Sequence, residues 1–250
     1  MMRLLVSVAR EEEVAPAVSG GADIVDVKNP AEGGLGAAEP GRIGRIRALT
    51  PAAVPVSVAI GDAPMLPGTM ALAALGAAGC GVQYVKVGLF GPRDAAQAER
   101  LLAAVSLAVR ESHPRTRVIA AGYADARAFG AVEPEALPAL AARAGAHGCM
   151  LDTLAKDGRC LFDFLDVAGL TAFVRQCRSL GLESALAGSL RLAHAPRLCE
   201  LAPDIVGVRS AVCAGDRTNG RVSARAVAGL REALTGAGAP VARAAPCGAP

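Results

Sequence analysis

Short runs of apolar and β-branched residues alternate along the chain with longer segments, rich in Ala, Leu and Arg, whose apolar positions recur with helical spacing. Most of the short runs are apolar at consecutive positions, which is typical of parallel strands buried on both faces. The runs that predict strands are residues 4–8, 23–27, 54–60, 83–87, 117–121, 148–152, 184–187 and 205–209. The segments that predict helices are residues 11–19, 41–49, 69–78, 95–111, 134–144, 163–181, 190–201 and 224–234.

Eight strand-helix units predict an α/β fold, a single (βα)8 TIM barrel, over residues 1–235. The alternative is a doubly wound open sheet, which usually carries a glycine-rich dinucleotide fingerprint in its first strand-to-helix turn. That turn, residues 9–13, reads Ala-Arg-Glu-Glu-Glu and contains no glycine. Residues 236–250 are rich in Gly, Ala and Pro without apolar period and predict a disordered C-terminal tail.

Composition narrows the class of protein further. A chain of 250 residues with 52% hydrophobic content can bury roughly 70–75% of its unfolded surface, enough for one large domain without disulfides. The seven cysteines show no Cys-x-x-Cys spacing and the three histidines share no spacing, so no metal site is expected.

The first apolar run is too short for an export signal or a membrane span, which favours a cytoplasmic protein without membrane contact. The net charge of +3 is spread along the chain and only 3% of residues are aromatic, which argues against a nucleic-acid partner.

Lysines and aspartates gather at the ends of the predicted strands, where barrels of this kind carry their catalytic groups. Asp26 and Lys28 end the second strand and, by period-two alternation, lie on the same side. Lys86 stands between two valines in the fourth strand, while Asp152 ends the sixth strand and Lys156 follows in its loop. Neighbouring cations lower the pKa of a lysine and free the neutral amine that attacks a carbonyl, so this set predicts imine chemistry.

Each of these residues also has a purely structural interpretation. Lys28 alone could be an exposed lysine at a strand end. Lys86 could form a buried ion pair with Asp26 or Asp152, although such pairs give little stability for their desolvation cost. Asp152 and Lys156 could form a salt bridge across their own turn.

A phosphate site is expected in the loops after the seventh and eighth strands. Gly188 allows the backbone to approach an anion, and Ser189 is expected at the N-terminus of the following helix, where it could equally serve as an ordinary N-cap. Arg209 ends the eighth strand and can hold a phosphate through two hydrogen bonds. Together these residues predict that the substrates are small phosphorylated aldehydes or ketones.

Three lysine-bearing segments resemble those of one known family. They are Asp-Val-Lys-Asn-Pro at 26–30, Val-Lys-Val-Gly at 85–88 and Leu-Asp-Thr-x-x-Lys-Asp-Gly at 151–158, together with Gly-Gly-Leu-Gly at 33–36 and Gly-Val-Arg at 207–209. The family is that of the (5-formylfuran-3-yl)methyl phosphate synthases, also called 4-(hydroxymethyl)-2-furancarboxaldehyde-phosphate synthases, of methanofuran biosynthesis. The resemblance extends from residue 4 to about residue 234 and excludes the tail.

The resemblance implies a TIM-barrel lyase that condenses two glyceraldehyde 3-phosphate molecules into a phosphorylated furan aldehyde, with loss of phosphate and water and without an external cofactor. It implies that Lys28 forms the Schiff base, that Lys86 acts as an acid and base, and that Asp26, Asp152 and Lys156 assist proton transfers. The glycine-rich loop at 33–36 and the loop at 61–68 are expected to close over the barrel mouth. The Ala-rich outer helices could also pair in a homo-oligomer.

Two other functions remain open on the sequence. A different lysine-imine aldolase on the same barrel would use Lys28 and Lys86 but release a linear sugar phosphate. A non-catalytic barrel that binds a phosphorylated ligand would depend on Gly188 and Arg209 and would not need either lysine.

Overall fold

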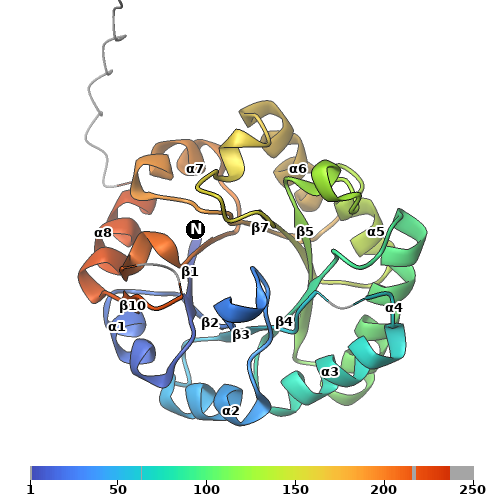
Figure 1. The fold of residues 1–250 in the computed structure, drawn as a ribbon, viewed down its shortest axis with the longest axis horizontal. Helices are drawn as coiled ribbons and strands as arrows, with labels where there is room; N and C mark the ends of the chain where they lie inside the picture. The colour runs from blue at the N-terminus through green and yellow to red at the C-terminus, as the bar shows by residue number, and fades with distance from the viewer. Residues whose placement is uncertain (1, 63, 216–217, 237–250) are drawn as a thin grey trace, which may run out of the picture.

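The computed structural model describes residues 2–62, 64–215 and 218–236, and these form a closed barrel of eight parallel strands surrounded by helices (Figure 1). This confirms the predicted (βα)8 TIM barrel. Each strand pairs with the next in the sequence, and the last pairs with the first to close the ring. The strands are β1 (Arg3–Val8), β2 (Ile24–Val27), β3 (Val56–Ala59), β4 (Tyr84–Gly88), β5 (Arg117–Tyr123), β6 (Gly148–Asp152), β7 (Glu183–Leu186) and β8 (Ile205–Val208).

The outer layer consists of helices that follow the strands in order (Figure 1). They are α1 (Val14–Ser19), α2 (Pro40–Leu49), α3 (Pro67–Gly79), α4 (Ala95–Ser112), α5 (Leu137–Arg143), α6 (Val167–Ser179), α7 (Ala195–Leu201) and α8 (Ala224–Leu234). In two of the predicted helices the segments at 11–13 and 192–194 form 3-10 turns, η1 (Glu11–Glu13) and η5 (Leu192–His194), instead of α-helix. Pro196 stands in the first turn of α7, where its missing N–H has no helical partner to lose. A short two-stranded antiparallel sheet follows β8 and was not predicted. Its strands are β9 (Cys213–Ala214) and β10 (Arg221–Val222).

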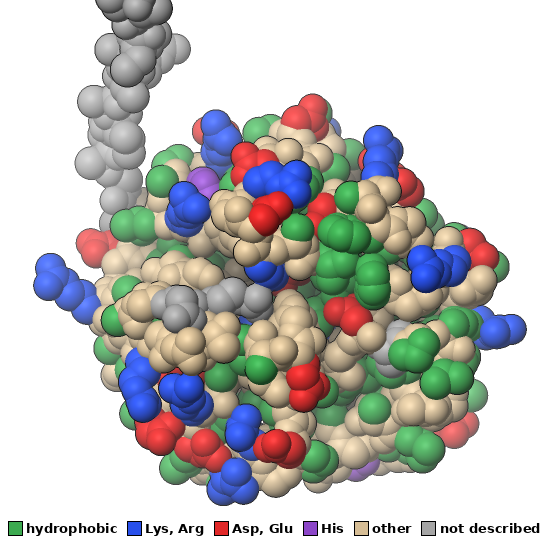
Figure 2. Space-filling view, viewed as in Figure 1, with side chains coloured by type: hydrophobic (Ala, Val, Ile, Leu, Met, Phe, Trp, Pro, Cys, Tyr) green, Lys and Arg blue, Asp and Glu red, His purple; other side chains and the backbone are tan. Residues whose placement is uncertain are grey.

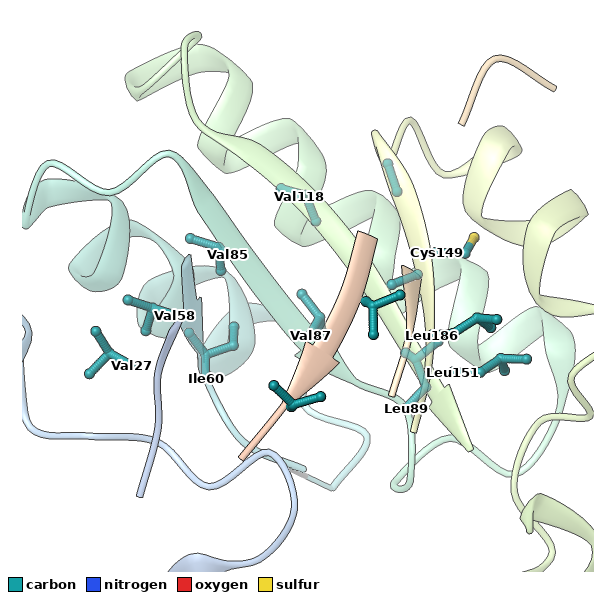
Figure 3. Close-up of a cluster of buried hydrophobic side chains, with 14 of the residues drawn as sticks. Val27, Val58, Ile60, Val85, Val87, Leu89, Val118, Cys149, Leu151 and Leu186 are labelled. Carbon is teal, nitrogen blue, oxygen red and sulfur yellow. The ribbon is translucent and has the colours of Figure 1, made fainter. Parts of the chain in front are cut away.

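The strands are buried on both faces, and the two faces serve different purposes. One face packs against the helices through a large cluster of aliphatic side chains that includes Val58, Val85 and Leu151 (Figure 3). The other face fills the barrel with a smaller apolar cluster that includes Leu5, Ile24, Tyr84, Ile119 and Met150. Both clusters are apolar and buried, as is expected of a TIM barrel, whose interior is a packed core.

The inward-facing positions change from apolar to charged toward the carboxyl ends of the strands. Because side chains alternate along a strand, Asp26 lies above Ile24, Lys86 above Tyr84 and Asp152 above Met150 on the inner face. These three charged side chains are each 3% exposed or less. The apolar floor therefore holds a layer of charged groups at the mouth of the barrel.

The connection between β2 and α2 crosses the mouth of the barrel. In Figure 1 its short turn, η2 (Pro30–Glu32), is the blue coil in the middle of the ring. Leu35 from this connection is fully buried and belongs to the same inner cluster as Met150. In the space-filling view of this face, most charged side chains lie around the periphery and only a few stand near the centre (Figure 2). We call residues 29–39 the mouth loop.

Of the predicted tail at 236–250, residues 237–250 lie outside the described residues, while helix α8 ends at Leu234 as expected. Within the described ranges, no helix combines the length and the apolar character needed to cross a membrane.

The contribution of the buried Leu35 side chain to the stability of the fold can be measured. We expect Leu35→Ala to lower the free energy of unfolding by about 2–5 kcal/mol, since its side chain fills part of the core. Denaturant unfolding would measure this, with Leu72→Ala as the control because Leu72 on α3 is 72% exposed. If both variants were to change stability by less than about 0.5 kcal/mol, Leu35 would not be part of the cooperative core.

Candidate active site

The structure brings all of the predicted catalytic and phosphate-binding residues except Asp26 to the wall of one cavity at the carboxyl ends of the strands. Lys28, Lys86, Asp152 and Lys156 line it, and so do Gly188, Ser189 and Arg209 from the loops after β7 and β8. Its volume is about 30 Å³, which holds no more than one or two water molecules. Ligand pockets usually enclose about 300–1,000 Å³. The cavity is thus much smaller than an ordinary ligand pocket.

Lys28 is a buried amine at the centre of this site. It follows β2, is 7% exposed, and its Nζ donates a hydrogen bond to the carbonyl of Gly34 in the mouth loop at 3.3 Å. Burial lowers the pKa of Lys28 to about 8, and the charges of Lys86 and Lys156 contribute, against the opposite effect of two aspartates. About one amine in ten is then neutral at pH 7, compared with about one in 3,000 for an ordinary lysine. The interpretation of Lys28 as an exposed strand-end lysine is therefore wrong.

Lys86 and Asp26 form a buried ion pair across β2 and β4. The Nζ of Lys86 lies 2.8 Å from Asp26 Oδ2, and the two side chains are 3% and 0% exposed. The same carboxylate oxygen accepts a hydrogen bond from the hydroxyl of Ser7 at 2.9 Å, whereas Asp26 Oδ1 accepts none from the described residues. The predicted structural alternative, an ion pair of Lys86, is thus present. Because Lys86 also lines the cavity, the pair holds its ammonium group at the site.

Asp152 and Lys156 also form the predicted ion pair, at 2.8 Å between Nζ and Oδ1. Burial acts to raise the pKa of Asp152, but the charges of Lys156 and Lys28 outweigh it and lower the pKa to about 2. Asp152 is therefore ionised near neutral pH and balances the charge of the lysines.

Asp125, which was not predicted from the sequence, holds the loop that carries Lys156. Its two carboxylate oxygens accept hydrogen bonds from the backbone N–H groups of Leu154 and Ala155, each at 2.8 Å. The prediction ended the fifth strand at residue 121, whereas β5 continues to Tyr123 and so brings Asp125 to the barrel mouth. An acid two residues beyond a strand end was the signal that could have found it.

The loop after β7 differs from its prediction. Gly188 lines the cavity with φ of 104°, and an added Cβ would lie 2.9 Å from the methyl group of Thr153, while its approach to an anion stays a prediction. Ser189 lines the cavity, but it was wrong to place it at a helix N-terminus, because the first helical turn starts only at Leu192. Its backbone lies in the left-handed region, with φ of 49°. The hydroxyl of Ser189 therefore lies in a strained turn rather than at a helix dipole.

Arg209 lies on the cavity wall, held by a partner that was not predicted. Its guanidinium makes two hydrogen bonds to the carboxylate of Glu13, at 3.1 and 3.2 Å, and a third to the carbonyl of Ser7 at 2.9 Å. Glu13 is 1% exposed and also accepts from the backbone N–H of Ala9 and of Val222. Arg209 is thus a fixed cation at the cavity, and its contact with a phosphate stays a prediction. From the sequence, Glu13 had been treated only as part of an acidic turn.

A search of the described residues for three or more His, Cys, Asp or Glu side chains able to share a metal ion finds none.

Comparison with known sequences identifies close relatives. The profile of a family described as 4-HFC-P synthase matches residues 4–231. The (5-formylfuran-3-yl)methyl phosphate synthase of Methanothermobacter thermautotrophicus is 50% identical over 93% of this chain and 99% of its own length. That of Methanocaldococcus jannaschii is 50% identical over 92% of this chain and 99% of its own length. The similarity therefore extends over nearly the full length of the relatives.

Solved structures share the barrel at much lower sequence identity. The 3-hexulose-6-phosphate synthase of Salmonella typhimurium has a TM-score of 0.63 and 20% identity, covering 94% of this chain and 99% of its own. The phosphoribosyl anthranilate isomerase of Thermus thermophilus has a TM-score of 0.62 and 18% identity, and the match covers 94% of this chain and 98% of its own. These likenesses support the fold alone.

The low pKa of Lys28 predicts an unusual pH dependence of its reactivity. The rate of its reductive methylation by formaldehyde should rise up to about pH 8 and then level off, because the neutral amine is the nucleophile. Peptide mapping by mass spectrometry after short reactions would give this rate for Lys28 separately. In Lys86→Met the midpoint should move to higher pH, since a neighbouring positive charge is lost. A rate that continues to rise toward pH 10.5 in the wild type would contradict the lowered pKa of Lys28.

Because Glu13 and Arg209 form a buried ion pair, substitutions at the two positions should have non-additive effects on the free energy of unfolding. Arg209→Ala should lower the free energy of unfolding by about 3–5 kcal/mol, since it leaves the Glu13 carboxylate buried without its cation. The double variant Glu13→Gln/Arg209→Met should recover much of this loss, because neither charge remains buried. Denaturant unfolding of the single and double variants would measure the coupling, and additive losses would show that the two side chains act independently.

Proposed function

Because the chain belongs to the (5-formylfuran-3-yl)methyl phosphate synthase family, we propose that it condenses two molecules of glyceraldehyde 3-phosphate into 4-(hydroxymethyl)-2-furancarboxaldehyde phosphate through an imine on Lys28. The reaction is that of a lyase, needs no external cofactor, and supplies the furan of methanofuran-type cofactors. The observation that carries the proposal is the buried Lys28 amine, which has a pKa of about 8 and shares its cavity with Lys86 and Lys156.

Lys28 supplies the covalent step. Its neutral amine adds to the aldehyde carbon of the first triose phosphate, and loss of water gives a protonated imine. The imine withdraws electrons from the neighbouring carbon, so that the C–H bond at that carbon becomes acidic. Removal of this proton gives an enamine that can attack the aldehyde of a second triose phosphate.

Lys86 and Asp26 are suited to proton transfers next to the imine. The ammonium group of Lys86 has three donors, and one of them is engaged by Asp26 Oδ2 at 2.8 Å. The other carboxylate oxygen, Asp26 Oδ1, accepts no hydrogen bond from the described residues and so can take a proton without breaking a contact. We assign to this pair the removal and return of protons on the first triose.

Asp152 and Lys156 supply charge rather than a second base. With a pKa of about 2, Asp152 stays ionised and stabilises a positive charge on the imine nitrogen. Lys156 lies beside it, and its side chain is 19% exposed, which allows it to reach an entering phosphate. Gly188, Ser189 and Arg209 line the opposite part of the cavity, where they can hold the phosphate of the imine-bound triose.

The mouth loop supports a closing step. The carbonyl of Gly34 accepts the hydrogen bond of the Lys28 amine, so the closed loop covers the nucleophile. Opening of the loop frees this amine and makes room for substrate, and closure over the intermediate limits its loss to water. The later dehydration, ring closure and phosphate loss lead to an aromatic ring, which favours the product.

Product analysis tests this function against the runner-up aldolase. Glyceraldehyde 3-phosphate alone should give a furan aldehyde phosphate, detected by its ultraviolet absorbance and its mass, whereas another imine aldolase would release a linear sugar phosphate. Lys28→Met should abolish product, and Lys86→Met should lower turnover by about 100-fold or more while the protein stays folded. Phosphate-ligand binding without any turnover in the wild type would favour a binding protein and contradict the proposal.

A further inference from the structure

A second group of ionisable side chains lies at the barrel mouth on the side of β3 to β5. Asp62 follows β3, and Tyr123 is the last residue of β5. The hydroxyl of Tyr123 donates a hydrogen bond to Asp62 Oδ2. Tyr123 is 1% exposed and belongs to the inner cluster of the barrel, so this phenol points inward rather than to solvent. Neither residue is used by the chemistry proposed for the lysines.

Gly88 fixes the Asp62 carboxylate inside the barrel. Alternation along β4 puts residues 84, 86 and 88 on the inner face. A Cβ added at Gly88 would lie 2.1 Å from Asp62 Oδ1, so the carboxylate occupies the space that an inward side chain would fill. A backbone hydrogen bond also holds this segment against β4, because the N–H of Gly88 donates to the carbonyl of Gly61 at 3.2 Å. Asp62 therefore stands one inward position above Lys86.

The surroundings of the pair favour protonated forms. Burial raises the pKa of Asp62, and the negative charge of Asp152 acts in the same direction, although the hydrogen bond from Tyr123 opposes them. Burial raises the pKa of Tyr123, and so does its contact with Asp62. In addition, Asp62 Oδ1 accepts no hydrogen bond from the described residues. Tyr123 thus keeps its proton until an acceptor with a developing negative charge reaches it.

Leu35 is a fully buried residue of the mouth loop. It lies in the same buried cluster as Tyr123 and Ala59, at the inner face of β5 and β3. The lysine cavity adjoins β1, β2, β4 and the ends of β6 to β8, and it has only about 30 Å³. A condensation of two trioses needs room for a second one. Tyr123 is paired with Asp152 in the register of β5 and β6, so the Asp62–Tyr123 pair lies next to a residue that lines this cavity.

We propose that Asp62 and Tyr123 are the acid pair of the second triose phosphate, and that the Tyr123 hydroxyl protonates its aldehyde oxygen as the carbon–carbon bond forms. The inference rests on the proposed function. The enamine carbon on Lys28 attacks the aldehyde carbon, and the electron pair of the C=O bond moves to oxygen, which takes the phenolic proton. Asp62 acts here in its protonated form: its carboxyl group returns a proton to the phenolate, and the proton that enamine formation removed from C2 of the first triose, carried through solvent, restores it.

The experiment separates the two halves of the reaction. In D2O, enamine formation on Lys28 exchanges the C2 hydrogen of glyceraldehyde 3-phosphate for deuterium, which mass spectrometry measures independently of furan formation. Tyr123→Phe should lower furan formation by about 100-fold or more, while the exchange rate stays within about threefold of the wild type. Tyr84→Phe is the matched control, because Tyr84 is the only other tyrosine and its hydroxyl lies at the barrel floor, bonded to Arg3. It should leave both rates unchanged.

Asp62→Asn provides a second, nearly isosteric variant. Its amide can still accept the hydrogen bond of Tyr123 but cannot return a proton, so furan formation should fall while exchange persists. Furan formation in Tyr123→Phe equal to that in Tyr84→Phe would overturn the inference, and so would a parallel loss of exchange and furan formation in both site variants. A wild-type protein that catalyses neither process would instead count against the proposed function itself.

Discussion

The structure depends on an amine that is kept away from water. Lowering the pKa of Lys28 from 10.5 to about 8 corresponds to roughly 3 kcal/mol against its charged form. Because the folded-state pKa is lowered, this cost is full below about pH 8, where both the folded and unfolded states hold the proton, and fades between pH 8 and 10.5. The barrel carries this cost at neutral pH, where a solvent-exposed lysine would cost nothing. In return a useful fraction of the amine is neutral, which a lysine imine mechanism requires.

The rest of the mouth is arranged around that amine. Lys86 and Lys156 are each held by a carboxylate at 2.8 Å, so their positive charges are fixed near Lys28 without being left unpaired. A further set of residues holds this charged layer in place. Asp125 fixes the loop of Lys156, and Glu13 fixes Arg209. The apolar floor of Tyr84 and Met150 beneath them keeps the layer in a medium where these charges interact strongly.

Much of this was predictable from the sequence, and the reasons differ between elements. Consecutive apolar positions predicted eight buried parallel strands, and alternation put Asp26 and Lys28 on one side, because these patterns depend on local geometry alone. The partners of Glu13 and the hydrogen bonds of Asp125 were not predictable, since they join segments that the barrel closure brings together. Ser189 was misplaced because the sequence does not show that the chain makes a left-handed turn before the next helix. Asp62 was missed because its place on the inner face depends on Gly88 of the neighbouring strand.

The central claim is that Lys28 is the residue that becomes covalently bound to a triose. Borohydride added during turnover of glyceraldehyde 3-phosphate should reduce the imine and leave a stable triose phosphate adduct, which peptide mapping would locate at Lys28 and which Lys28→Met should lack. An adduct found on Lys86 or Lys156 alone, or no adduct on an enzyme that turns over, would contradict the account.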